Sequence, residues 1–134
     1  MRYLLDTNIC IYVIKQQPLR VMEKFRACDV GDIVISSITV SELWYGVAKS
    51  QNQAANSKAL RQFLLPLNVV SFDERAAEAY GEIRATLEQA GEPIGGMDLL
   101  IAAQAVSLGI PLVTNNEREF TRVPNLIIEN WASV

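Results

Sequence analysis

The chain has 134 residues, half of them hydrophobic and a fifth charged, a composition typical of one globular domain. It contains no histidine, which excludes a Ser-His-Asp triad, an imidazole base and a zinc site with histidine ligands. Its formal net charge of −3 differs from that of a dedicated nucleic-acid binder, so any nucleic-acid partner would require a bound divalent cation to offset the acids.

Short hydrophobic strands alternate with helices along the whole chain. The strands are predicted at residues 3–5, 33–35, 69–70, 112–113 and 126–128. The helices are predicted at residues 8–16, 18–28, 39–49, 57–65, 71–90 and 97–108, with a helical turn at residues 116–120. This alternation predicts an α/β fold with a mostly parallel sheet, formed by a single domain over residues 1–134.

Three of the helix starts are predicted from capping patterns. Thr7 is expected to be the N-cap of the first helix, and Thr39-x-x-Glu42 and Ser71-x-x-Glu74 match capping boxes. The helix at residues 97–108 is hydrophobic nearly all round, which predicts a position in the centre of the domain.

No feature of the sequence indicates a membrane or an oxidising compartment. The longest unbroken hydrophobic run, Ile9 to Ile14, is too short for a membrane span, and the N-terminus lacks a signal-peptide pattern. Cys10 and Cys28 lie among apolar neighbours and are expected to pack in the core. We therefore expect a cytoplasmic protein.

Charge is distributed unevenly along the chain. Residues 1–70 carry eight basic and five acidic side chains, whereas residues 71–134 carry four basic and ten acidic ones. In a parallel sheet, the functional cleft lies beyond the carboxyl ends of the strands, so the residues just after each strand are the candidates for chemistry.

Four acidic residues fall at that edge of the predicted sheet: Asp6, Glu42, Asp98 and Glu119. Each also has a purely structural interpretation. Asp6 is a possible N-cap, Glu42 and Glu119 are possible partners in capping boxes, and Asp98 suits the positive end of its helix dipole. For each residue both interpretations remain open at this point.

Two observations favour a functional site. Asp98 lies on a helix of almost entirely apolar residues, where an unpaired carboxylate is costly. Several carboxylates in one cleft would also repel one another unless a cation neutralised them. With no histidine, the ligands are all oxygen atoms, which favours Mg²⁺ or Mn²⁺ over zinc and suits phosphodiester hydrolysis.

Two other folds with an acidic cleft fit the residues badly. A phosphatase of the haloacid-dehalogenase type requires a second acid two residues after the first, where this chain has Asn8. A receiver domain requires a lysine after a late strand, where this chain has Thr114, Asn115 and Asn116.

The sequence resembles the PIN domain over essentially its whole length, and more narrowly the VapC toxins of bacterial type II toxin–antitoxin pairs. Four ordered blocks carry the resemblance: Leu5-Asp6-Thr7-Asn8, SSITVSEL at residues 36–43, PIGGMD at residues 93–98 and TNNEREF at residues 114–120. The resemblance implies a five-stranded parallel sheet flanked by helices and a Mg²⁺- or Mn²⁺-dependent endoribonuclease.

The resemblance also implies two sets of site residues. The catalytic and metal-binding carboxylates are Asp6, Glu42, Asp98 and Glu119. The supporting polar residues are Thr7, Asn8, Thr114 and Asn116. We expect Asp6 and Asp98 to hold the ion, Glu42 to orient or deprotonate the attacking water, and Glu119 to position the ion or the leaving group. Because many relatives carry Asp where Asn116 stands, one firmly held ion is expected.

Partners follow from the same resemblance. It implies a VapB-like antitoxin whose C-terminal segment covers the cleft, a homodimer, and a toxin–antitoxin hetero-oligomer that binds operator DNA only through the antitoxin. The enteric branch cuts the anticodon stem-loop of initiator tRNA and so inhibits translation. Arg118, Lys15 and Lys49 are candidate RNA contacts, and Trp44 and Tyr45 are candidates for the antitoxin groove. A PIN-like RNA-processing nuclease and a catalytically silent RNA-binding module remain the alternatives.

Overall fold

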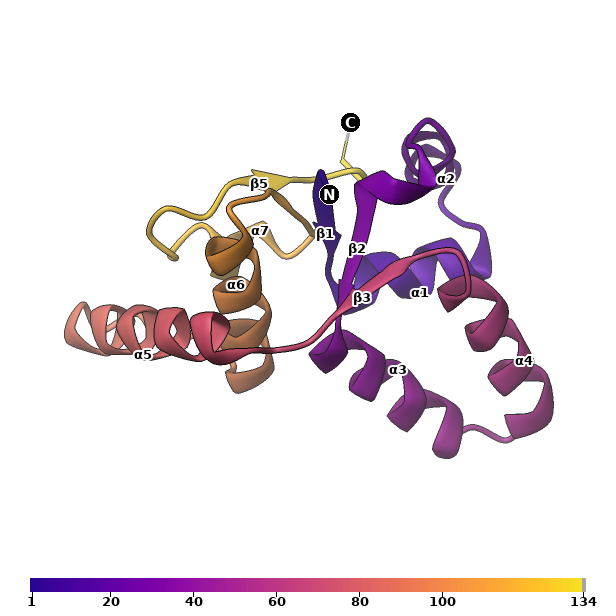
Figure 1. The fold of residues 1–134 in the computed structure, drawn as a ribbon, viewed down its shortest axis with the longest axis horizontal. Helices are drawn as coiled ribbons and strands as arrows, with labels where there is room; N and C mark the ends of the chain where they lie inside the picture. The colour runs from indigo at the N-terminus through magenta and orange to yellow at the C-terminus, as the bar shows by residue number, and fades with distance from the viewer. Residues whose placement is uncertain (134) are drawn as a thin grey trace.

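The computed structural model describes residues 1–133, which form one parallel sheet between two layers of helices (Figure 1). The five strands lie in the order β3-β2-β1-β4-β5, and every neighbouring pair is parallel. They span Tyr3–Leu5 (β1), Ile33–Ser36 (β2), Asn68–Val70 (β3), Leu112–Val113 (β4) and Ile128–Glu129 (β5). The predicted fold class is confirmed, and the last strand begins two residues later than expected.

Within the described residues, seven α-helices connect and cover the strands. They span Thr7–Lys15 (α1), Leu19–Arg26 (α2), Ser37–Ala48 (α3), Gln53–Leu64 (α4), Glu74–Gln89 (α5), Gly96–Leu108 (α6) and Glu117–Phe120 (α7). A short 3₁₀ helix at Val30–Asp32 precedes β2. In Figure 1, α1 to α4 lie on one side of the sheet and α5 to α7 lie on the other.

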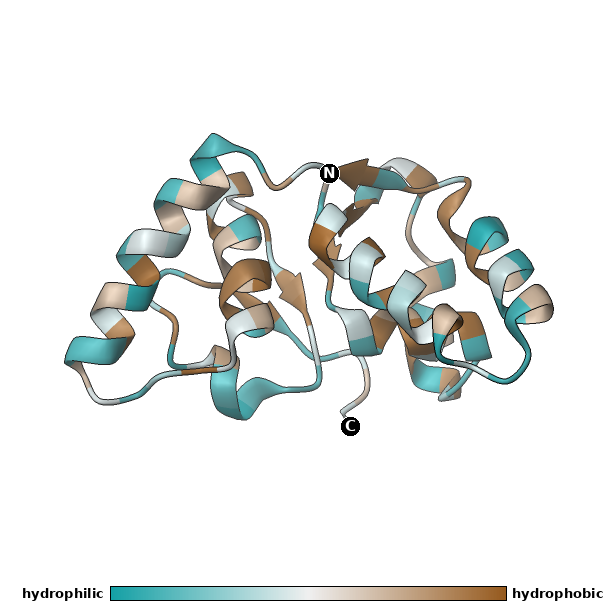
Figure 2. Ribbon diagram, turned by 90° about the horizontal axis from the view of Figure 1, so that it is seen from below, coloured by the Kyte–Doolittle hydropathy of each residue, from teal (hydrophilic) through white to brown (hydrophobic). Residues whose placement is uncertain are grey.

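Alternating side chains of the central strands supply the two halves of the core. Leu4 and Leu112 pack with α5 and α6 in one cluster, whereas Leu5 and Val113 pack with α1, α2 and α4 in the other. This alternation follows from the two-residue period of a strand. Figure 2 shows the hydrophobic residues concentrated in the strands and on the helix faces turned toward them. No helix within residues 1–133 is both long and apolar enough to cross a membrane.

The interior positions of α6 and of one cysteine agree with the sequence patterns. Six residues of α6 are buried, as expected of a helix that is hydrophobic nearly all round: Leu99, Ile101, Ala102, Ala103, Gln104 and Ala105. Cys10 is fully buried, and burial raises the pKa of its thiol well above the usual value. Cys28 is only partly buried.

The three predicted helix caps are wrong, and each error has the same physical cause. Asp6 rather than Thr7 caps α1, Ser36 rather than Thr39 caps α3, and Asp73 rather than Ser71 caps α5. In each case, an earlier or better placed side-chain oxygen accepts the bond of a free backbone N–H. The Ser36 hydroxyl accepts from the backbone N–H of Ile38 at 3.1 Å. Thr39 and Glu42 therefore take no part in capping α3.

Candidate active site

Asp6 stands at the end of the central strand and is 6% exposed. Its Oδ1 accepts a hydrogen bond from the backbone N–H of Ile9 at 2.9 Å, and its Oδ2 accepts one from the Thr114 hydroxyl. The side chain therefore caps α1 and also lies at the edge of the sheet. Asp6 is thus both a helix cap and a candidate site carboxylate. Burial raises the pKa of Asp6, while the bonds from Thr114 and Ile9 work in the opposite direction.

Glu42 reaches the same edge from the second turn of α3. The hydroxyl of Thr7 donates a hydrogen bond to Oε1 of Glu42 at 2.6 Å, and the buried hydroxyl of Thr39 lies 3.5 Å from that of Thr7. Since α3 begins at Ser37, Glu42 is not the capping partner of Thr39. Its carboxylate is instead oriented by the first residue of α1.

Asp98 and Glu119 meet across the start of α6, and Asn116 joins them. The amide of Asn116 donates to Oδ2 of Asp98 at 3.3 Å and to Oε2 of Glu119 at 3.0 Å. The backbone N–H of Asn116 donates to the Thr114 hydroxyl at 2.9 Å. One network of hydrogen bonds thus runs from β1 through β4 to the first turn of α6 and to α7.

The electrostatics of this pair are unusual for surface acids. Burial, a hydrogen bond from the protonated carboxyl to Glu119, and the charges of Glu119 and the neighbouring acids raise the pKa of Asp98 to about 7. The pKa of Glu119 is lowered by its bonds with Asp98 and Asn116, by the backbone N–H of Gly95 and by the charge of Arg122. At pH 7, Asp98 is therefore protonated in about half of the molecules, and Glu119 accepts a hydrogen bond from the protonated form.

The donor set fits a hard divalent cation. The carboxylates and hydroxyls at this edge offer oxygen atoms, the ligands that hard divalent cations prefer. Within residues 1–133, no three acidic or cysteine side chains approach closely enough to form a ready-made metal cluster. The carboxylates are held in place by threonine and asparagine side chains, and they are open to an additional ligand.

The supporting residues differ in what they contact. Thr7, Thr114 and Asn116 each bond to a predicted site carboxylate. Asn8 is exposed, and its backbone N–H contributes to lowering the pKa of Asp6.

Sequence reasoning missed two neighbours of the site. Asn115 donates to the Tyr12 hydroxyl at 2.8 Å, and Arg122 donates to the carbonyl of Pro93 at 3.0 Å. Asn115 was visible as part of a polar run after a strand, whereas no sequence pattern singles out Arg122.

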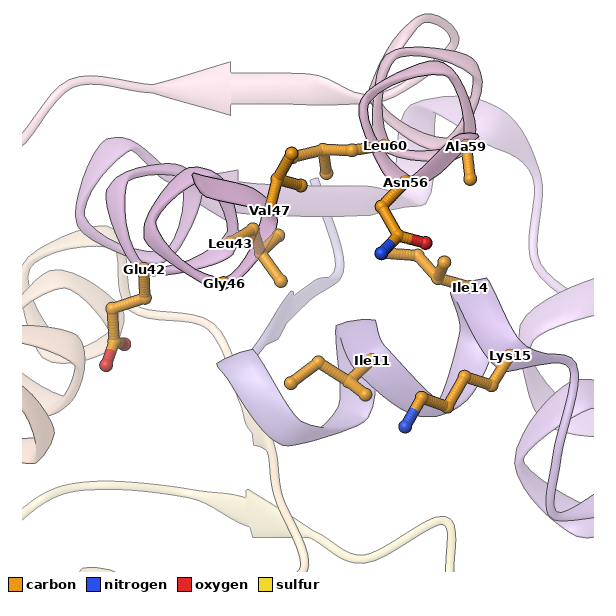
Figure 3. A pocket seen from close by; sticks show the side chains of 10 residues that line it. All are labelled: Ile11, Ile14, Lys15, Glu42, Leu43, Gly46, Val47, Asn56, Ala59 and Leu60. Atoms are coloured by element: carbon orange, nitrogen blue, oxygen red, sulfur yellow. The ribbon is translucent and has the colours of Figure 1, made fainter. Parts of the chain in front are cut away.

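A groove of about 290 Å³ lies beside Glu42 between α1, α3 and α4 (Figure 3). Its floor is apolar and its two ends are charged: Figure 3 shows Glu42 at one end and Lys15 at the other. The apolar lining residues are Ile11, Ile14, Leu43, Gly46, Val47, Ala59 and Leu60. Trp44 and Tyr45 do not line it, and their rings lie against Arg61 and Lys49 instead.

The candidate RNA-binding cations are placed differently. Lys15 is exposed at the groove, and Arg118 is exposed on α7 next to Glu119. Lys49 covers the Tyr45 ring, with its ammonium 4.9 Å from the ring centroid. Arg118 therefore neighbours a site carboxylate along the chain, Lys15 lies at the end of the groove opposite Glu42, and Lys49 is engaged by the Tyr45 ring.

The parallel sheet carries acidic side chains along its carboxyl edge, which defines an α/β domain with a candidate metal-binding cleft. The model of the PIN domain family matches residues 3–126. The chain is 46% identical over 132 residues to "Ribonuclease VapC2" of Rickettsia felis, covering 98% of both chains. It is 43% identical to "tRNA(fMet)-specific endonuclease VapC" of Shigella flexneri, covering 98% of this chain and 99% of that protein.

A solved structure shows the same fold. The crystal structure of DNA-bound VapBC from Salmonella typhimurium matches with a TM-score of 0.93 and 42% identity, covering 98% of this chain and 99% of that chain. The chain therefore belongs to the PIN domain family and, within it, to the VapC ribonucleases. The predicted family is confirmed.

Proposed function

We propose that this chain is a Mg²⁺- or Mn²⁺-dependent endoribonuclease that cuts tRNA and serves as the toxin of a toxin–antitoxin pair. The observation that carries the proposal is the network linking Asp6, Thr114, Asn116, Asp98 and Glu119 at the carboxyl edge of the sheet. The Shigella relative named for tRNA(fMet) supports initiator tRNA, cut in its anticodon stem-loop, as the specific substrate.

Asp6 and Asp98 are the side chains that would hold the ion, with Glu119 beside them. When bound, a Mg²⁺ or Mn²⁺ ion supplies a Lewis acid for the phosphate and lowers the pKa of an attacking water. Thr114 keeps the carboxylate of Asp6 in one orientation, and Asn116 does the same for Asp98. These supporting bonds prevent the like-charged carboxylates from turning away from one another.

Glu42 is the proposed general base. The Thr7 bond to Oε1 leaves Oε2 free to accept a proton from water. The partial exposure of Glu42 gives water access to that oxygen.

RNA is expected to approach over the side of the sheet formed by the first half of the chain. Residues 1–70, which include α1 to α4, carry a net charge of +3, whereas residues 71–134 carry −6. Lys15 lies on this basic side, and Arg118 lies next to Glu119 on α7. Contacts to the phosphate backbone by such side chains supply affinity and position the RNA without reading its sequence.

The groove between α1, α3 and α4 is the proposed seat of the antitoxin. Its apolar floor suits hydrophobic side chains of a peptide segment, and Glu42 at its end suits a basic side chain that would neutralise the site. The VapBC complexes among the similar structures, two of them bound to DNA, support an antitoxin partner and operator binding through it. A homodimer of the chain is part of the same proposal.

The test is cleavage of total cellular RNA by the purified, partner-free chain with Mg²⁺, Mn²⁺ or EDTA, followed by mapping of the new ends. Asp6→Asn is the matched variant, because it keeps the shape of the side chain that caps α1 while removing its charge. Discrete cuts that need both metal and Asp6 are expected. Absence of cleavage by a folded chain with either metal would favour a silent RNA-binding module, and cuts outside tRNA would favour an RNA-processing nuclease.

A further inference from the structure

The loop before α6 leads directly to Asp98, and it has few internal contacts that would fix its conformation. Residues 91–95 have no regular secondary structure, and Gly95, the N-cap residue of α6, makes no side-chain cap. Loops with few contacts of their own sample many conformations, and fixing them costs conformational entropy. Contacts from outside the loop therefore add to the packing of α6 in holding Asp98 in position.

Three consecutive residues of this loop are each held by a different contact. The carbonyl of Pro93 accepts a 3.0 Å hydrogen bond from Nη1 of Arg122, and Ile94 is buried in the core. The backbone N–H of Gly95 faces the carboxylate of Glu119 and lowers its pKa. Two of the three contacts come from α7 and the turn that follows it. The position of Asp98 thus depends on residues about 20 to 30 positions further along the chain.

Arg122 is well anchored for such a role. Its backbone N–H donates to the carbonyl of Glu119 at 3.1 Å. Its neighbour Val123 and the nearby Phe120 are only 4% and 1% exposed, so the backbone at this point is fixed in the core. The guanidinium also brings positive charge to Glu119, which lies against Asp98. Arginine suits this task because its planar group offers several donors and stays charged.

We propose that Arg122 is a positioning residue that clamps the loop at residues 91–95 to α7 and so holds Asp98 against Glu119. It acts through Pro93 and Glu119 and does not touch RNA. The inference rests on the proposed function, since it assigns Arg122 a part in building the same metal site.

The test compares Arg122→Ala, Arg122→Lys and a matched control, Arg75→Ala, which removes an exposed arginine from α5. Three quantities are measured on the full chain: Mn²⁺ affinity by calorimetry without RNA, hydrogen exchange of the amides of residues 94–99, and kcat and KM for RNA cleavage. Thermal unfolding of each variant establishes that it is folded.

For Arg122→Ala we expect Mn²⁺ affinity and kcat to fall about 10- to 100-fold, the range seen when residues that orient metal ligands are removed. The amides of residues 94–99 should exchange faster, while KM for RNA changes less than about twofold since no RNA contact is lost. Arg122→Lys should restore most of the affinity and exchange protection, because it keeps a donor and a charge. Arg75→Ala should leave Mn²⁺ affinity, exchange and kcat unchanged.

Several results would overturn the inference. Unchanged Mn²⁺ affinity and exchange in Arg122→Ala would show that the loop holds itself, and a rise in KM alone would make Arg122 an RNA contact. Failure of Arg122→Lys to recover any protection, with the fold intact, would also count against a clamp. If the unmodified chain neither binds Mn²⁺ nor cleaves RNA, the proposed function fails, and the exchange data would still report separately on the clamp.

Discussion

The hydroxyl of Thr7 donates a 2.6 Å hydrogen bond to Oε1 of Glu42 and so joins the first turn of α1 to the second turn of α3. Asp6, the residue before Thr7, caps α1 and lies at the centre of the site. The two residues that follow β1 therefore contribute to two of the four carboxylates. Asp6 is itself one of them, and Thr7 orients the carboxylate of Glu42 through its hydrogen bond.

Replacing Thr7 by valine tests this relationship. Thr7→Val keeps the shape of the side chain and removes the donor, so we expect kcat to fall about tenfold or more, as for other residues that orient an active-site ligand. Stability should change little, since Glu42 is partly exposed and can bond to water. Steady-state cleavage assays are the measurement. Thr86→Val, which removes a hydroxyl bonded only within α5, is the control, and equal activity of both variants would rule out the assigned role.

Metal affinity should depend on pH near neutrality. An ion at Asp98 must displace the proton held there with a pKa of about 7, so Mn²⁺ affinity should increase up to about tenfold per pH unit below pH 7 and level off above pH 8. Calorimetry in buffers of different ionisation enthalpy would report about one proton released per ion at pH 6 and few at pH 8. An affinity that is flat between pH 6 and 8 would contradict the raised pKa of Asp98.

Asp98→Asn should stabilise the metal-free chain more at pH 8 than at pH 5. The pKa of Asp98 is raised in the folded state, so the unfolded chain, with an ordinary carboxyl pKa of about 3.9, loses this proton first. Stability of the unmodified chain therefore decreases from about pH 4 to 7, and the variant escapes this loss. Because the side chain is about half exposed, solvent screening reduces the effect. Urea unfolding in EDTA at both pH values measures the gain in unfolding free energy of the variant over the unmodified chain. A gain that becomes smaller as the pH rises would contradict a raised pKa of Asp98.

Ala59→Glu should weaken antitoxin binding. Ala59 lines the groove, and a charge there would be desolvated beneath apolar side chains of the antitoxin, which should lower affinity at least about tenfold, or about 1.4 kcal/mol. Ala54→Glu is the matched control, since Ala54 is exposed on the same helix and is not part of the groove. Titration with purified antitoxin measures the affinity. Equal affinity of the two variants would place the antitoxin elsewhere.

The strand and helix layout was predictable because it depends on local patterns. Alternating short strands and amphipathic helices indicate an α/β fold, and a helix such as α6 with no polar face can only lie inside. Helix caps were less predictable, as Ser36 and Asp73 show, since several oxygens compete for the same N–H groups and backbone geometry decides between them.

By itself, the sequence determined which functional groups are present and at which edge of the sheet they lie. Acidic residues follow the strands and histidine is absent, so the ligands are oxygen atoms that suit a hard cation. Only the tertiary structure decided which side chains meet. Thr114 bonds to Asp6 across 108 residues and Thr7 to Glu42 across 35, and Arg122 reaches Pro93 from beyond α7. Composition and periodicity describe neighbours along the chain, whereas these contacts depend on the strand order, which places β1 beside β4 and brings distant loops to one edge.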